Sequence, residues 1–328
     1  MLGSAKELIG AMAHILNKPV LDKSRNIVID GHALIQPRVG VDLTSSRKSL
    51  FTKLYAGSGG TDSYTNAISD IYQDNFDEGI FTGKGIYDLE LFHKILCDEI
   101  PENKVLSHDL LEGNFLRCGL LTDVMLLDGY PTRYIPYILR NHRWTRGDWQ
   151  IIEWLKNSRL NEISKFKIYD NLRRSLLQIF SIIMIIIACF NILNNNFSNY
   201  LIALVGILGI VIPYLIDIIN YVIFKESNIT GAVYAYKKFS KELNGLKISS
   251  LRIILQILFL PYETLKNIDA IIKSLYRMNK KIKLLEWVTS EDGDKNAKTD
   301  LKSYCKEMSI NFFIGILFKK GECLCQTK

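Results

Sequence analysis

This chain of 328 residues is divided by an uncharged apolar run, SLLQIFSIIMIIIACFNIL, at residues 175–193. A second run, YLIALVGILGIVIPYLIDIINYVIF at residues 200–224, follows a short polar link and contains one charged residue, Asp217. Each run is long enough for a helix that crosses about 30 Å of hydrocarbon. We therefore predict two transmembrane helices. The alternative is a helical hairpin in a soluble core, which needs protein on every side of both helices.

Basic residues flank this pair of runs on both outer sides, whereas the link between the runs is uncharged. They are Lys156, Arg159, Lys165, Lys167, Arg173 and Arg174 before the pair, and Lys225, Lys237, Lys238 and Lys241 after it. Because cytoplasmic flanks carry the excess of Lys and Arg, both outer flanks are predicted to be cytoplasmic. We expect a multi-pass protein of the cytoplasmic (inner) membrane with its soluble part in the cytosol. Asp217 is interpreted as a polar residue near the interface.

Two further apolar stretches, residues 251–262 and 310–318, are too short to span a bilayer. Residues 251–262 run into residues 265–277, where apolar residues at helical spacing have lysines between them, so interfacial helices on the membrane surface are predicted at residues 251–277. Residues 308–318 are interpreted as the start of a further span. We accordingly divide the chain into a soluble part, residues 1–155, and a membrane region, residues 156–328.

The soluble part has the mixed pattern of an α/β fold. Apolar residues at helical intervals predict a helix at residues 5–16, and a second helix is expected at residues 88–97. Residues 26–35 look like two strands joined at an Asp30–Gly31 turn, and residues 36–41 extend the second strand.

Composition limits the class of protein. Apolar residues make up 48% of the chain and concentrate in its second half, and the formal net charge is +7. The six cysteines show no regular ligand or disulfide spacing, which indicates reduced thiols. No metal site is predicted, because Cys323 and Cys325 have no second pair of ligands nearby. The first residues lack the pattern of a signal peptide.

A first island of chemically suggestive residues spans residues 106–113. Its Asp109 can act as a general base; the alternative is a helix N-cap, and His108 is equally well explained as a structural hydrogen-bonding residue. Gly83 and Gly85 surround Lys84, but two glycines do not make a phosphate-binding loop.

A second island spans residues 140–150. Arg140, Arg143 and Arg146 recur at intervals of three on an expected helix, with Trp144 between them. Such a face offers guanidinium groups to a diphosphate and an indole ring to a sugar. The alternative is a basic helix near the membrane with its tryptophans at the interface.

In this order the islands resemble the membrane-bound family 2-like glycosyltransferases and, in detail, the glycosyltransferase region of the cyclic β-1,2-glucan synthases. The resemblance reaches to about residue 310 and implies that residues 1–155 are the C-terminal half of a GT-A-type glycosyltransferase domain, followed by α-helical membrane segments. It rests on residues 35–39, 72–74, 78–88, 101–103, 106–113, 129–131, 142–150, 170–175, 260–263 and 284–287.

The resemblance implies a role for each candidate residue. Asp109 would be the catalytic base that deprotonates an acceptor hydroxyl for attack at the anomeric carbon, which inverts the donor's α linkage to β. Gly83 would lie beside the acceptor, while Arg143 and Arg146 would counter charge on the leaving diphosphate. Arg140 stands where the family has glutamine. The substrate-binding set is Gly83, His108, Arg140, Arg143, Trp144 and Arg146.

The resemblance also implies partners and a cofactor. The partners are the UDP-sugar donor UDP-glucose, a glucan acceptor and the lipid bilayer. The cofactor is Mg²⁺ or Mn²⁺, bound through an Asp-x-Asp motif in a donor-binding half. That motif is expected upstream of residues 5–16, where this sequence has none; Asp292-Gly293-Asp294 lies in a polar tail. We expect a β-1,2-glucan synthase segment that is inactive alone, and no nucleic-acid partner.

Two other functions stay open. One is another processive β-glycan synthase of the cellulose-synthase-like kind. The other is a non-catalytic membrane partner, complementing a separately encoded donor-binding half, or a remnant of a split synthase.

Overall fold

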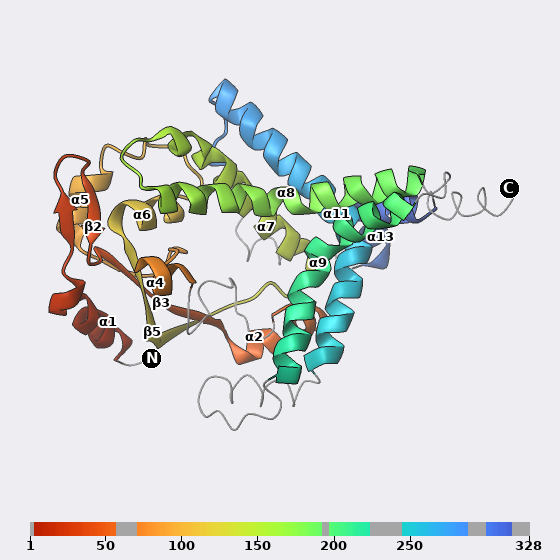
Figure 1. Ribbon diagram of the computed structural model, residues 1–328, viewed down its shortest axis with the longest axis horizontal. Coiled ribbons are helices and arrows are strands. Elements are labelled where there is room, and N and C mark those ends of the chain that lie inside the picture. Colours follow the sequence, from red (N-terminus) through yellow and green to blue (C-terminus); the bar gives the residue numbers. More distant parts are fainter. Residues whose placement is uncertain (1–2, 57–70, 192–196, 224–244, 288–299, 317–328) are drawn as a thin grey trace, which may run out of the picture. The chain divides into compact units, whose positions relative to one another are not determined.

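A computed structural model of the chain describes residues 3–56, 71–191, 197–223, 245–287 and 300–316. These residues form a largely helical α/β structure with two small sheets (Figure 1). The chain forms two compact units, Met1–Leu172 with Ile271–Glu291, and Arg173–Ala270 with Asp292–Lys328. The division between them falls inside a long helix, α8 (Glu162–Asn191).

The first unit contains all the strands that the structure describes. In chain order its elements are α1 (Ser4–Ala13), η1 (Ile15–Asn17), β1 (Val20–Asp22), β2 (Ile27–Asp30), β3 (Leu34–Val41), α2 (Leu43–Arg47), α3 (Leu50–Tyr55), α4 (Ile71–Phe76), β4 (Ile86–Tyr87), α5 (Leu89–Leu96), α6 (Asp109–Leu116), β5 (Cys118–Asp128), α7 (Tyr134–Gln150), η2 (Ile151–Lys156) and the start of α8 (Glu162–Asn191). The helices predicted at residues 5–16 and 88–97 are confirmed as α1 and α5. Helix α1 ends at Ala13 because the backbone of His14 is extended.

The central sheet has the strand order β4-β3-β5, and β3 and β5 lie side by side in Figure 1. Strand β3 runs parallel to β5, and it pairs with β4 in the antiparallel sense at Leu34 and Ile35. The register of β3 against β5 shifts between Pro37 and Arg38. A bulge fits this place, because proline has no N–H to donate to the ladder.

The two strands predicted at residues 26–41 form, but the hairpin between them is wrong. Strand β2 pairs with β1 in a separate sheet, whereas β3 pairs with β4 and β5. The Asp-Gly turn therefore carries the chain from one sheet to the other. Gly31 has a φ of +61°, and a Cβ there would lie 2.1 Å from the carbonyl oxygen of Lys18, so only glycine fits this crossing.

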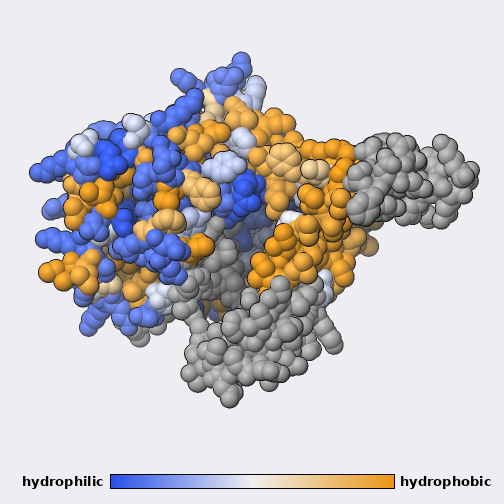
Figure 2. Space-filling view, viewed as in Figure 1, coloured by the Kyte–Doolittle hydropathy of each residue, from blue (hydrophilic) through white to orange (hydrophobic). Residues whose placement is uncertain are grey.

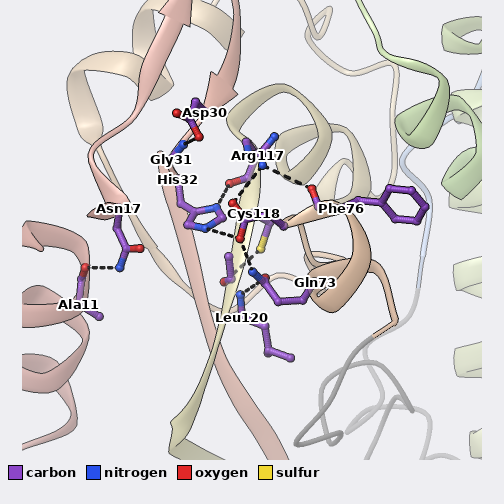
Figure 3. A network of polar contacts seen from close by, with 12 residues as sticks. Ala11, Asn17, Asp30, Gly31, His32, Gln73, Phe76, Arg117, Cys118 and Leu120 are labelled. Atoms are coloured by element: carbon purple, nitrogen blue, oxygen red, sulfur yellow. Dashed lines mark hydrogen bonds and ion pairs between the residues drawn. The ribbon is translucent and has the colours of Figure 1, made fainter. Parts of the chain in front are cut away.

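Polar contacts join this crossing to α4 and to the start of β5 (Figure 3). Nδ1 of the buried His32 lies 3.0 Å from the carbonyl oxygen of Arg117. The Arg117 guanidinium donates to the carbonyl oxygen of Phe76 at 3.4 Å, and the Leu120 N–H donates to the Gln73 side chain at 2.9 Å. These contacts place the carboxyl end of α6 and the beginning of β5 beside the sheet crossing.

The core of the first unit lies between the sheet and helices α5 and α6. The side chains of Leu34, Leu111, Phe115 and Leu116 are completely buried. Ile168 from the start of α8 belongs to the same cluster. Burial of such side chains is the main contribution to the stability of this unit.

The second unit is helical where it is described. It contains the rest of α8, α9 (Phe197–Ile223), most of α11 (Gly245–Lys280) and α13 (Leu301–Glu307). The described residues of both predicted spans lie in helices, α8 and α9. Among the described residues, one helix, Glu162–Ala188, is long and apolar enough to cross a membrane, and Leu201–Ile212 is a shorter apolar helix. Figure 2 shows hydrophobic residues gathered over this helical part.

Several predictions for the membrane region concern α11 and the residues after it. The stretch predicted as interfacial helices at residues 251–277 forms one continuous helix that contains Pro261. Residues 309–316 are helical, in accord with the apolar run at 308–318. The side chain of Asp217 and the basic residues that follow the second run lie outside the described part of the chain.

Helices α8 and α9 pack closely through two glycines. A Cβ at Gly206 would lie 2.9 Å from Cβ of Met184, and one at Gly209 would lie 2.8 Å from a methyl carbon of Leu177. Small residues at such positions let helix backbones approach each other, as they do in helix pairs inside membranes.

A buried ion pair anchors the start of α8 to the sheet region. The Lys167 ammonium donates to the Glu78 carboxylate at 2.8 Å and to the carbonyl oxygen of Gly79 at 3.0 Å. Both side chains are almost completely buried. Glu78 lies five residues before the candidate site residue Gly83, so this pair fixes one end of the loop that carries Gly83.

Replacing one member of this pair will destabilise the fold. We expect Lys167→Met to lower the free energy of unfolding by about 3–5 kcal/mol, because it leaves the Glu78 carboxylate buried without its cation. The double variant Lys167→Met with Glu78→Leu should recover most of the loss. Thermal unfolding of the full chain in detergent gives the order of the three proteins; a double variant less stable than Lys167→Met would contradict this account.

Candidate functional site

Asp109 is the first residue of α6 and lies at the end of the loop from residue 106. The N-cap position of that helix is His108, whose side chain makes no cap hydrogen bond, so the alternative of an N-cap aspartate is wrong. The Ser107 hydroxyl donates to the Asp109 carboxylate at 3.3 Å. Burial and the neighbouring Glu112 raise the pKa of Asp109 above its ordinary value.

Gly83 faces this carboxylate. Its φ is +94°, and a Cβ there would lie 3.1 Å from Oδ2 of Asp109. The buried side chain of Gln36 on β3 holds the preceding loop, since it donates to the carbonyl oxygen of Ile80 at 2.9 Å and accepts from the Thr82 N–H at 2.7 Å. The peptide backbone thus lies beside the carboxylate with no side chain between them.

Glu112 lies one turn after Asp109 and is buried. Its carboxylate contacts Nδ1 of the exposed His108 at 2.6 Å and accepts from the Tyr87 hydroxyl at 3.2 Å. The bond to Glu112 raises the pKa of His108, while burial and Glu112 raise the pKa of Tyr87. Glu112 is therefore committed to its two neighbours, whereas the Asp109 carboxylate faces the backbone of Gly83.

Potential metal ligands come together once among the residues that the structure describes. Donor atoms of His108, Asp109 and Glu112 lie within 4.8 Å of one another. Two of the three already contact each other, and Glu112 also holds Tyr87. This donor set does not fit a resident divalent cation well, because a cation would have to displace both contacts.

The three arginines of α7 have different surroundings. Arg140 is buried, and its guanidinium lies 4.9, 5.6 and 4.7 Å from the ring centres of Tyr130, Tyr137 and Trp144. Its Nε has no hydrogen-bond partner among the described residues. Cation–π contacts of this kind hold a guanidinium without a carboxylate.

Arg143 interacts electrostatically with the candidate base, and each affects the pKa of the other. Its guanidinium stacks over Trp287 at 4.6 Å from the ring centre. Burial lowers the pKa of Arg143, while the attraction of Asp109 opposes that shift. Arg146, in contrast, donates to the backbone carbonyl oxygens of Glu286 at 2.8 Å and Leu284 at 3.4 Å. Its predicted contact with a diphosphate stays a prediction.

The structure thus brings Gly83, His108, Asp109 and Arg143 together, with Arg140 and Trp144 on the adjoining turn of α7. Sequence reasoning did not single out Glu112 or Trp287 as part of this site. A signal for Trp287 existed, because residues 284–287 are among the stretches that carry the resemblance.

The close contact between Gly83 and Asp109 can be tested by adding one methyl group. We expect Gly83→Ala to lower the unfolding temperature, because alanine is strained at this φ and its Cβ presses on the carboxylate. Gly129→Ala is the matched control, since a Cβ there meets nothing within 4 Å. Thermal unfolding of both full-length variants checks this; equal midpoints would contradict the geometry at Gly83.

The sequence of the chain was compared with known proteins. No protein-family model matches the chain. The chain is 33% identical, over 313 residues and 94% of its length, to the cyclic beta-(1,2)-glucan synthase NdvB of Rhizobium meliloti (strain 1021). The matched region makes up 11% of that synthase. The chain is therefore related, over nearly its whole length, to a region of a cyclic β-(1,2)-glucan synthase.

Proposed function

We propose that this chain carries the acceptor side and the catalytic base of a glycosyltransferase that builds β-1,2-linked glucan from UDP-glucose. The observation that carries the proposal is the Asp109 carboxylate, which faces the bare backbone of Gly83, has a raised pKa and is attracted by the guanidinium of Arg143. The relation to a β-1,2-glucan synthase supports the choice of glucan. In this proposal residues 1–155 form the C-terminal half of a GT-A-type domain.

Asp109 acts as the general base. Its carboxylate takes the proton of an acceptor hydroxyl while that oxygen forms a bond to the anomeric carbon of the donor. The bond from that carbon to the UDP oxygen breaks at the opposite face, and UDP leaves with the electron pair. One displacement inverts the α linkage of the donor to β. A carboxylate with a raised pKa is a stronger base for this step.

Arg143 counters the charge that develops on the leaving diphosphate. Stacking on Trp287 fixes its guanidinium, and a fixed cation stabilises developing charge with little reorganisation. Arg140 and Trp144 lie on the adjoining turn and are proposed to contact the acceptor. His108, exposed beside the base, completes the substrate-binding set.

The donor and its divalent cation are proposed to be held by a donor-binding segment that contributes an Asp-x-Asp motif, on the same polypeptide or a separate one. When bound, Mg²⁺ or Mn²⁺ would neutralise the diphosphate. The cluster at His108 does not suit that role, so no step is assigned to a cation there.

The membrane region is proposed to hold this site at the cytosolic face of the inner membrane. Helices α8 and α9 are the proposed spans, and α11 is proposed to lie in the interface. In support, the apolar side chains of Ile254, Leu258 and Leu265 on α11 are exposed. Such side chains can enter the acyl boundary of a bilayer while basic residues of the same helix, such as Arg252 and Lys266, stay among the headgroups.

Removing the proposed base will abolish most of the transfer. In membranes of the organism that makes the protein, supplied with UDP-glucose, Mn²⁺ and a β-1,2-linked gluco-oligosaccharide, we expect Asp109→Asn to lower glucan formation by about 10²- to 10⁴-fold. The control is Asp123→Asn, which changes an exposed acid on β5. Linkage analysis of the product separates a β-1,2-glucan from a β-1,4-glucan.

An unchanged rate in Asp109→Asn would overturn the assignment of the base, and a β-1,4-linked product would favour the cellulose-synthase-like alternative. Activity of the purified full chain would overturn the need for a further donor-binding segment.

The acid limb of the rate profile reports on Asp109. The base must be ionised, so the rate rises as the pH passes through its pKa, which lies above the ordinary value. Glu112 raises that pKa and His108 lowers it. We therefore expect Glu112→Gln to move the limb to lower pH and His108→Gln to move it to higher pH. Shifts in the same direction for both variants would contradict this assignment.

A further inference from the structure

One face of α7 contacts both the loop before Asp109 and a second segment far away in sequence. We call that segment, residues 281–287, the strap; it follows α11 and ends at Trp287. The face consists of Arg143, Arg146, Gly147 and Gln150. Positions spaced by three, four and seven residues lie in one stripe along a helix, so these residues point in one direction.

The loop is held against this stripe by Gln150 and Gly147. The Leu106 N–H donates to the side-chain oxygen of Gln150 at 2.7 Å. A Cβ at Gly147 would lie 2.8 Å from Cβ of Ser107, so the loop and the helix touch where glycine leaves room. Ser107 in turn donates to the Asp109 carboxylate. The stripe therefore sets the position of the base through Leu106 and Ser107, which lie three and two residues before it.

The strap is held by the same stripe. The side-chain nitrogen of Gln150 donates to the carbonyl oxygen of Leu284 at 3.0 Å, and Arg146 donates to the carbonyl oxygens of Leu284 and Glu286. Both side chains are almost completely buried, at 1% and 6% exposure. Arg277 adds a bond to the carbonyl oxygen of Lys283 at 3.0 Å.

Gln150 uses both ends of its amide. The oxygen accepts from the loop and the nitrogen donates to the strap, and a side-chain amide is suited to such a double task because it carries an acceptor and donors on one group. An ionised carboxylate would keep the first bond and lose the second. One buried residue thus joins the base loop to the segment that presents Trp287.

The last residue of the strap, Trp287, contacts Arg143, the second charged group of the site. Trp287 stacks on Arg143, and Arg143 feels the attraction of Asp109. The loop holds the Asp109 carboxylate and the strap holds the Arg143 guanidinium, and both segments are bound to the same face of α7.

We infer that Gln150 and Arg146 are positioning residues that align Asp109 with Arg143 by holding the base loop and the strap on one face of α7. The chemistry of Asp109 and Arg143 rests on the proposed function; the connection between the loop and the strap does not.

Hydrogen exchange followed by mass spectrometry on the full chain in detergent tests the connection. Arg146→Met removes two bonds to the strap and leaves the bond between Leu106 and Gln150 in place, whereas Gln150→Leu removes a bond to each segment. We expect exchange in the strap to rise about tenfold or more in both variants, and exchange at Leu106 to rise by a similar factor only in Gln150→Leu. The control is Arg159→Met, because Arg159 also donates to two distant backbone carbonyls, those of Arg25 and Asn26.

Glucan formation in native membranes tests the alignment. At saturating UDP-glucose we expect Arg146→Met and Trp287→Ala each to lower the rate by about ten- to a hundredfold. The double variant should be no slower than either single variant, because each change alone already frees the Arg143 guanidinium from its fixed position. Trp287→Phe keeps a ring under the guanidinium and should recover most of the rate. Arg159→Met should lower the unfolding temperature and leave the rate per folded molecule unchanged.

Unchanged exchange in the strap of Arg146→Met would overturn the inference. So would rates in Arg146→Met and Trp287→Ala that fall no further than in Arg159→Met. Wild-type membranes that form no glucan would overturn the proposed function instead, and the exchange pattern would then decide whether the two segments are joined as inferred.

Discussion

The site depends on the close approach of α7 to the residues that precede Asp109, and any side chain at position 147 would prevent it. Because Gly147 leaves room for Ser107 against the helix, the residues that lead to Asp109 follow α7, where Arg143 lies one turn before Gly147 and attracts the Asp109 carboxylate. The same approach brings Leu106 to Gln150. Contact between Cβ of Ser107 and the bare backbone of Gly147, rather than a packed apolar side chain, thus holds the base loop against the helix.

Buried polar side chains hold the segments of the site that have no regular structure. Gln36 braces the loop before Gly83, Lys167 holds its other end at Glu78, and Gln150 braces the loop before Asp109. Each neutral bond adds only about 0.5–1.5 kcal/mol of net stability, and a bond between charged groups about 1.5–3 kcal/mol. Leaving such a buried group without its partner costs more, so these residues fix one conformation of each loop more than they stabilise the whole fold.

Local sequence patterns predicted much of this arrangement, but they did not predict which strands pair with each other. Periodicity indicated α1, α5 and α7, and the strands at residues 27–41 were apparent from composition. The hairpin was wrong because pairing partners are chosen over long distances, here by β1, β4 and β5. Spacing placed three arginines on one helix, yet only tertiary contacts show that Arg140 meets aromatic rings while Arg146 meets carbonyl oxygens from residues 284 and 286.

The pairing of Asp109 with Arg143 also suits the order of events in the proposed reaction. Burial disfavours charge on both side chains, and each favours the charge of the other. When the acceptor proton passes to Asp109, its carboxyl becomes neutral and the attraction between the two is lost. At the same moment negative charge develops on the leaving diphosphate. The attraction of Arg143 is then available to the leaving group, so proton transfer and bond cleavage favour each other.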